Sequence, residues 1–142
     1  MVPESLETGT VDLYRAVNFP AEWQFERNLL RDVAAVDPTI AFHDGRFWLF
    51  VGGINCKEAI NEDLYLFYSD SLHGPWLPHK QNPILSDVRK SRPAGRLFYH
   101  KGQLVRPSQD CSPQYGRAVG FNRVDELSPT DYRETPVAMI GP

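Results

Sequence analysis

The stretch Val36-Asp-Pro-Thr-Ile-Ala-Phe-His-Asp-Gly-Arg-Phe-Trp-Leu-Phe50 decides how this chain folds. It holds two runs rich in β-branched and aromatic residues, 39–43 and 46–51, and such runs are typical of strands. The pair Asp44-Gly45 lies between them, and its glycine tolerates the positive φ that a two-residue type I′ turn requires. The stretch therefore predicts an antiparallel β-hairpin.

The hairpin belongs to an internal repeat, which is the most informative feature of the chain. The turn His43-Asp44-Gly45 returns as His100-Lys101-Gly102, between the strand-like runs 97–100 and 103–106. Further matches follow in the same order: Asp12 with Asp63, Trp23 with Trp76, Leu30-Arg-Asp-Val33 with Leu85-Ser-Asp-Val88, and Asp37-Pro38 with Arg92-Pro93. An ordered set at a slowly drifting spacing of 51 to 57 residues indicates duplication of a structural unit.

Each unit reads as four strands, because the hairpin is followed by a third strand, 63–69 or 117–122, and by a short outer strand, 76–79 or 132–137. About 50 residues forming four antiparallel strands is the pattern of a propeller blade. We therefore expect an all-β fold, a partial β-propeller of about two and a half four-stranded antiparallel blades. Residues 1–142 would form a single domain, composed of an outer half-blade at 11–31 and blades at 38–85 and 93–140.

Composition sets outer limits on this interpretation. With 142 residues, 42% hydrophobic and 23% charged, the chain fits one soluble domain and not a disordered, collagenous or coiled-coil class. No apolar run approaches the roughly 18 residues of a membrane helix, and residues 1–10 lack a signal-peptide pattern. We accordingly expect a cytoplasmic protein without membrane insertion. Cys56 and Cys111 read as free thiols, and neither they nor the four histidines show metal spacing, so no metal or cofactor is expected.

Charge is unevenly distributed along the chain. The net charge of -3 argues against a nucleic-acid partner, yet residues 86–123 hold eight bases, six of them arginine, against two acids. Such a segment is either a solvated face or an arginine-lined site for a carboxylate or phosphate.

Two groups of motifs carry a resemblance to known families. Residues 36–50, together with Leu66-Phe-Tyr-Ser-Asp-Ser-Leu-His-Gly-Pro-Trp76, resemble blades of the five-bladed propellers of glycoside hydrolase family 43. The runs Ser91-Arg-Pro-Ala-Gly-Arg-Leu-Phe98, Arg106-Pro-Ser-Gln-Asp-Cys-Ser112 and Tyr115-Gly116 are similar to the propeller domain of glucosamine inositolphosphorylceramide transferases and related bacterial proteins. The resemblance covers about residues 11–135.

The family 43 resemblance implies a place for catalytic carboxylates, since glycoside hydrolysis generally needs two of them. Asp37, beside Pro38, matches the position of the general base, and Asp110 is a second carboxylate near the end of an inner strand. No glutamate falls in a matching proton-donor motif, because those considered lie in turns or outer segments: Glu58, Glu62, Glu126 and Glu134. Asp37 could instead cap a loop by binding backbone N–H groups.

The candidate binding residues are Arg92, Arg96, Arg106 and Tyr115. Arg92 takes the position of Asp37 in the next unit, so the two are expected to face a shared polar centre, where they pair structurally or hold an anionic sugar. Arg96 and Arg106 are expected near Arg92, or else in a salt-bridge network with Asp87 and Asp110. Alternating strand aromatics are expected to form blade core rather than a sugar platform: Phe47, Trp48, Phe50, Tyr65, Phe67 and Phe98. The repeated Trp23 and Trp76 are expected to pack as well.

Three functions follow as hypotheses. The leading one is recognition of a glycan or anionic sugar, with a carbohydrate or sugar phosphate as partner and no turnover by the chain alone. The second is a glycosidase of the arabinoside or xyloside type, active once oligomerisation completes the ring. The third is a structural module that assembles through open blade edges. Uncovered apolar faces on the first and last blades are expected to be buried, either in a homo-oligomer, most simply a dimer, or against a missing partner.

Overall fold

A computed structural model of the chain describes residues 1–4, 6–54 and 60–141, so Cys56 and Glu58 lie outside the described residues. Regular structure in the described ranges is β-strand apart from one 3-10 turn, η1 (Leu6–Thr8). The strands are β1 (Thr10–Asn18), β2 (Glu22–Arg31), β3 (Val36–His43), β4 (Arg46–Gly52), β5 (Asp63–Ser69), β6 (Leu77–Pro78), β7 (Leu85–Ser86), β8 (Phe98–His100), β9 (Gln103–Asp110), β10 (Ala118–Leu127) and β11 (Tyr132–Ile140). The all-β prediction is confirmed, and none of the described helical structure is long and apolar enough to cross a membrane.

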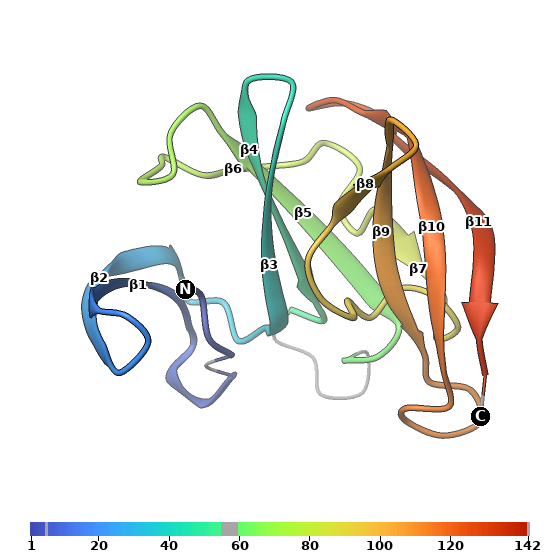
Figure 1. Ribbon diagram of the computed structural model, residues 1–142, viewed down its shortest axis with the longest axis horizontal. Helices are drawn as coiled ribbons and strands as arrows, with labels where there is room; N and C mark the ends of the chain where they lie inside the picture. The colour runs from blue at the N-terminus through green and yellow to red at the C-terminus, as the bar shows by residue number, and fades with distance from the viewer. Residues whose placement is uncertain (5, 55–59, 142) are drawn as a thin grey trace.

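The strands form three antiparallel sheets that follow one another in an arc from the N-terminus to the C-terminus (Figure 1). The first sheet is the pair β1-β2. The second has five strands, in the order β3-β4-β5-β6 with β7 also paired to β5, and the third has the order β8-β9-β10-β11. The chain is thus a partial β-propeller in which each complete sheet is ordered along the chain from its inner to its outer strand.

Both predicted hairpins are type I′. Asp44 and Gly45 have φ values of 49° and 74°, and Lys101 and Gly102 have values of 50° and 76°. Two successive positive φ values are what a type I′ turn requires, and this turn matches the right-handed twist of the flanking strands. The glycine at each second position makes the turn sterically easy, which fixes the register of β3 on β4 and of β8 on β9.

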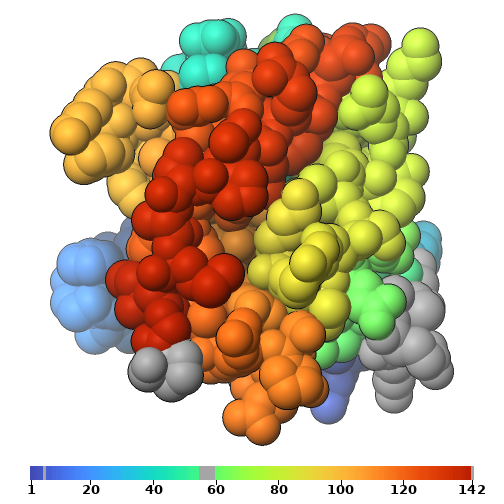
Figure 2. All heavy atoms as spheres, turned by 90° about the vertical axis from the view of Figure 1, so that its right-hand side faces the viewer, coloured from blue at the N-terminus to red at the C-terminus, as the bar shows by residue number. Residues whose placement is uncertain are grey.

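The outer edge of the second sheet differs from the predicted strand at 76–79. That strand is limited to Leu77–Pro78, and the two-residue strand Leu85–Ser86 pairs farther along β5. Between them, the side chain of Asn82 accepts a hydrogen bond from Leu66 N–H and donates one to Leu66 C=O, each 2.8 Å long. A side-chain amide therefore takes the place of a continuous strand. Seen from the side, β11 runs next to this segment (Figure 2), and Lys80 N–H donates to Pro129 C=O at 3.2 Å.

Two apolar junctions hold the three sheets together. Leu49, Val51 and Phe67 of the second sheet pack against Val11 and Leu13 of the first. The alternate residues of these strands of the second sheet point to the opposite face of that sheet. There the second sheet packs on the third through Ala41, Trp48, Phe50, Leu64 and Leu66, which contact Leu97, Leu104 and Tyr132. We call the side of a sheet that looks toward the next sheet along the chain its front face, and the opposite side its rear face.

The expected aromatic core is confirmed at most positions. Trp48, Phe50 and Phe67 are buried, and Trp76 packs against the first junction. Trp23 instead packs edge-on against Phe19 in the β1-β2 hairpin, with ring centroids 6.0 Å apart. Phe98 is 40% exposed, contrary to expectation. It lies on the front face of the third sheet, which none of the strands in the described ranges covers.

Candidate functional site

Asp37 and Arg92, which occupy equivalent positions in the repeat, meet at the end of the molecule where β3 begins. The Arg92 Nε donates to Asp37 Oδ2 at 2.8 Å, and its Nη1 donates to Asn61 Oδ1 at 2.7 Å. The Arg92 side chain is 11% exposed and that of Asp37 31%. We call Asp37, Arg92, Asn61, Tyr115 and Glu4 the entry cluster, because they gather at the entry to the inner strands.

Tyr115 contributes an aromatic surface to the cluster from the β9-β10 turn. The Arg92 guanidinium carbon lies 4.8 Å from the centre of the Tyr115 ring, a cation-π arrangement. Tyr115 is nevertheless 64% exposed. Since Arg92 is held from one side by a carboxylate and from another by the ring, its position is fixed while one side of the ring stays open to solvent.

The backbone at Asp37 is strained, and a second carboxylate lies beside it. Asp37 has a φ of 48°, which is uncommon for a residue other than glycine and which clusters at functional sites. Its N–H donates to Glu4 Oε2 at 3.3 Å, and its C=O accepts from the Thr39 hydroxyl at 3.1 Å. The entry cluster thus combines two carboxyl groups, a guanidinium, an amide and an aromatic face.

Asp110 is not part of this cluster. It ends β9, where its side chain is 3% exposed, and its Oδ2 accepts a 2.6 Å bond from Arg117. Its Oδ1 accepts from Ser112 N–H at 2.8 Å, so the carboxylate closes the β9-β10 turn that carries Tyr115. The structure therefore does not bring the predicted catalytic residues Asp37 and Asp110 together, since each binds different residues. Asp110 instead shapes the loop from which Tyr115 reaches Arg92.

Arg106 lies inside the third sheet rather than next to Arg92. Its guanidinium forms a two-point ion pair with Glu134 of β11, at 2.8 and 2.7 Å, and donates to Lys90 C=O at 2.7 Å. The side chains of Arg106 and Glu134 are each 1% exposed. The expected network of Arg106 with Asp87 and Asp110 is wrong: β11 turns Glu134, from a presumed outer segment, inward onto β9.

Tyr132 completes this buried group by donating its hydroxyl hydrogen bond to Glu134. Burial raises the pKa of Tyr132, so the phenol stays neutral over the working range of pH. Burial alone would lower the pKa of Arg106, but the neighbouring Tyr132 and Glu134 outweigh it and the pKa rises. The group is therefore a fixed internal ion pair, with the role of a structural link between β9 and β11.

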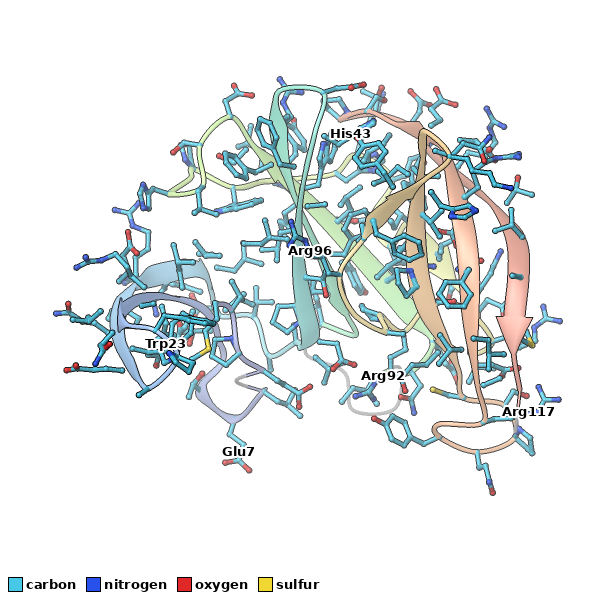
Figure 3. All side chains as sticks on the ribbon, viewed as in Figure 1. Glu7, Trp23, His43, Arg92, Arg96 and Arg117 are labelled. Carbon is cyan, nitrogen blue, oxygen red and sulfur yellow. The ribbon has the colours of Figure 1, made fainter. Side chains whose placement is uncertain are left out.

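Arg96 also lies apart from Arg92. Figure 3 shows Arg92 near the start of β3 and Arg96 farther along that strand. Arg96 is exposed and lines two mostly apolar hollows of about 400 and 500 Å³ beside the inner strands. Arg92 and Arg96 are separated because the chain between them is not a continuous strand. Pro93 forms an isolated bridge to Ser108 of β9, and Gly95 then turns the chain with a φ of 119°. The predicted neighbourhood of Arg92 and Arg96 is therefore wrong.

Sequence reasoning missed Glu4 and Asn61. Glu4 precedes the first strand and matches no motif, and Asn61 lies in the connection before β5, so neither residue carries a pattern of its own. The repeat equivalence of Asp37 and Arg92, together with the family resemblances that singled out Asp37 and Tyr115, pointed to this end of the molecule.

Comparison with known proteins gives a consistent result. Residues 1–140 match the family described as "Glucosamine inositolphosphorylceramide transferase 1, N-terminal". The chain is 42% identical over 142 residues to glucosamine inositolphosphorylceramide transferase 1 of Arabidopsis thaliana, covering 96% of this chain and 18% of that protein. The protein of the same name from Oryza sativa subsp. japonica is 40% identical over 141 residues, covering 96% and 19%. The chain therefore spans about a fifth of the length of these curated relatives.

Solved structures show the same fold. A Bacteroides ovatus protein titled "Xyloglucan PUL GH43B" aligns with a TM-score of 0.57 and 15% identity, over 89% of this chain and 25% of that one. A thermostable family-43 glycoside hydrolase aligns with a TM-score of 0.55 and 14% identity, over 91% and 48%. At these identities the likeness establishes the propeller architecture alone.

Proposed function

Because the chain belongs to the family of the glucosamine inositolphosphorylceramide transferase 1 N-terminal domain, we propose that it recognises a glycan and that the entry cluster holds the sugar. The observation that carries the proposal is Arg92, which is fixed by Asp37 and Asn61 and stacked on an exposed tyrosine. Carboxylate and amide groups suit sugar hydroxyls, and the open face of an aromatic ring suits the apolar side of a sugar.

The class of sugar follows from the charges in the cluster. The names of the relatives refer to glucosamine and to inositolphosphorylceramide, that is, to an amino sugar and a phosphorylated inositol lipid. A guanidinium binds phosphate or carboxylate by paired hydrogen bonds, while the carboxylates of Asp37 and Glu4 suit hydroxyl or ammonium groups. We therefore infer a ligand that carries an anionic group beside its hydroxyls, such as an inositol phosphate or an acidic sugar.

Replacing Arg92 with alanine should lower the affinity for such a ligand about 10- to 100-fold, because hydrogen bonds to a charged group are the strongest contacts available in the cluster. Calorimetric titration of the full chain with an inositol phosphate, glucuronic acid and glucosamine measures this effect. Arg46→Ala is the matched control, since Arg46 pairs with Asp70 at 2.8 Å at the opposite end of β4 and should leave binding unchanged. Absence of binding at millimolar ligand, or equal affinity in Arg92→Ala, would contradict the proposal.

A second candidate function, glycoside hydrolysis, is favoured by one observation: the carboxylate of Glu4 contacts the backbone of Asp37, so two carboxyl groups lie at one end of the partial propeller. If the chain hydrolyses aryl arabinosides or xylosides, Asp37→Asn should abolish the activity and Glu4→Gln should lower it. Release of the coloured aryl group is the measurement. Asp70→Asn serves as control because Asp70 lies in the turn after β5, away from the cluster. A wild-type chain inactive across the panel removes this candidate.

A further inference from the structure

Large side chains on the rear face of the second sheet fill the first junction. Val51 of β4 pairs with Tyr65 of β5, and Phe67 lies two residues farther along β5. All three pack in the apolar cluster of the first junction, where Val51 is fully buried. These positions show which kind of residue closes a junction between two sheets of this chain.

The equivalent positions of the third sheet carry small or polar residues. Counting along the repeat, Val51 corresponds to Ser108 of β9, and Tyr65 corresponds to its partner Gly120 of β10. Asn122, two residues farther along β10, stands at the position of the phenylalanine. The second junction lies between the second and third sheets of the chain itself, so this difference does not depend on where the chain begins or ends.

A hollow of about 290 Å³ lies where the large side chains are replaced. Its floor is formed by Ser108, Gly120 and Asn122, all of them buried. One wall is the turn at 87–90 and the other is the part of β11 at 136–139, both on the side of the molecule that faces the viewer in Figure 2. A Cβ atom on Gly120 would lie 3.0 Å from the Ser108 Oγ, so glycine keeps the floor open. We call this hollow the junction pocket.

The floor of the junction pocket has unused hydrogen-bonding capacity. The Asn122 Nδ2 donates to the Ser108 Oγ at 2.9 Å and to the Arg106 C=O at 3.2 Å. Within the described ranges, the hydroxyl hydrogen of Ser108 has no acceptor and the Oδ1 of Asn122 has no donor, although these residues are 0% and 2% exposed. Buried polar groups are normally paired, and two adjacent hydroxyl groups of a ligand would accept from the serine and donate to the amide oxygen.

The wall at 87–90 carries two positive charges and one negative charge. Arg89 binds both carboxylate oxygens of Asp87 at 2.9 Å, through Nε and Nη2, and this pairing leaves the charge of Lys90 in excess. Further bonds fix the turn, since the Lys90 N–H donates to the Asp87 C=O at 3.0 Å and the Asp87 N–H donates to the Ser91 Oγ at 2.9 Å. An excess cation on a fixed wall favours a ligand that carries an anionic group.

The opposite wall is apolar, because Pro136, Ala138 and Met139 of β11 form it. Such a wall suits the C–H groups of a ring, and small-molecule sites commonly combine an apolar lining with a few convergent polar groups. The volume of about 290 Å³ lies at the lower end of the range of roughly 300–1,000 Å³ for such sites, so the pocket admits a single ring.

We propose that the junction pocket binds a cyclic polyol with one anionic group, such as a sugar acid or an inositol phosphate. Two adjacent ring hydroxyls bind Ser108 and Asn122, the anionic group binds Lys90, and the ring lies against the apolar wall of β11. The described lining of this pocket includes none of the entry-cluster residues. The junction pocket is therefore a second site, and it does not rest on the function proposed for the first.

Nuclear magnetic resonance of the full chain locates binding residue by residue. In ¹⁵N–¹H spectra, inositol 1-phosphate or glucuronate should shift the amide resonances of Ser108, Gly120 and Asn122, with saturation in the millimolar range. Inositol alone and inorganic phosphate alone should each bind at least tenfold more weakly. Arg92→Ala should leave these shifts unchanged while removing any at the entry cluster, so the two sites can fail independently. No shift at the three floor residues, or equal binding of inorganic phosphate alone, overturns the proposal.

Two variants test the pocket by the affinity measured in the same titration. Ser108→Ala removes one hydroxyl and should weaken binding about 2- to 10-fold, the effect of one hydrogen bond. Ser69→Ala is the matched control, because Ser69 is also buried but lies at the end of β5 and binds Ser71 N–H.

Ala138→Phe fills the pocket from an exposed position without touching the bonds of the floor, and it should weaken binding at least tenfold. Ala138→Ser, which adds little volume, should bind as the wild type does. The spectrum of each variant verifies that it is folded, and Ala138→Phe still decides the question if Ser108→Ala does not fold. Wild-type affinity in Ala138→Phe, or in a folded Ser108→Ala, overturns the proposal.

Discussion

Replacing Glu134 with alanine is expected to lower the free energy of unfolding by about 3–5 kcal/mol, because it leaves the guanidinium of Arg106 buried without a counter-charge. Both side chains are 1% exposed, so solvent does not compensate for the lost carboxylate. Loss of this size is severe for a domain whose total stability is of the order of 5–15 kcal/mol. Urea unfolding monitored by tryptophan fluorescence measures the change. The dependence of the free energy of unfolding on urea concentration should stay the same in the variant, since this slope reports the surface exposed on unfolding.

Two comparisons separate the buried charge from a general loss of contacts. Replacing both partners, as Arg106→Met with Glu134→Leu, should cost less than Glu134→Ala alone, since no charge is then left inside. Arg89→Ala removes an exposed ion pair, with the Arg89 side chain 70% exposed, and should leave the free energy of unfolding close to that of the wild type. A Glu134→Ala variant within about 1 kcal/mol of wild type would contradict the structural role given to the pair.

The second large effect is expected at the junction between the second and third sheets. Phe50 is 1% exposed and contacts Tyr132 edge-on at 6.0 Å, so Phe50→Ala should lower the free energy of unfolding by about 3–5 kcal/mol through lost burial and the cavity left behind. Chemical unfolding measures this change as well. Because Tyr132 also binds Glu134, combining Phe50→Ala with Glu134→Ala should give a non-additive loss.

A matched aromatic tests whether burial is the cause. Phe42 lies on β3, in the same sheet, but is 58% exposed, and Phe42→Ala should cost less than about 1 kcal/mol. Similar losses for Phe42→Ala and Phe50→Ala would show that the second junction is not the main apolar contact between these sheets.

The sheets and their hairpins could be predicted from sequence because the determining signals are local and occur twice. The pairs Asp44-Gly45 and Lys101-Gly102 each fix a turn, and the turn fixes the register of the strands on both sides. Once register is fixed, the period of two along β4 determines which junction each buried residue faces, the first for Leu49 and Val51 and the second for Trp48 and Phe50. The exposed Phe98 escaped prediction because its own strand cannot show whether a further sheet covers it.

The partners of the arginines could not be predicted, since they depend on which face of a strand each side chain takes. Arg106 stands in the run Gln103–Asp110, where polar residues lie on both faces, so alternation does not reveal that this arginine points inward. Its partner Glu134 lies 28 residues away, on a strand separated from β9 by β10. Arg96 follows Gly95, whose positive φ breaks the simple strand geometry on which the prediction depended.

Only part of the entry cluster could be predicted from the sequence. The repeat equates Asp37 with Arg92, and equivalent positions in neighbouring blades lie side by side, so their ion pair follows from the repeat itself. Tyr115 was selected on a family resemblance, and the structure brings it onto Arg92 through a turn whose shape depends on Asp110.

The buried ion pair also bears on how a chain made of near-copies avoids folding incorrectly. Leu49 of β4 and Arg106 of β9 occupy the same position in the two units, one entirely apolar and the other charged. Exchange of strands between similar units is a characteristic error of repeat proteins. If β9 took the place of β4, the guanidinium would enter the leucine and valine cluster of the first junction without Glu134. That mismatch makes the exchanged arrangement less stable. The buried ion pair therefore ensures that β4 and β9, although similar in sequence pattern, each fold into the correct sheet.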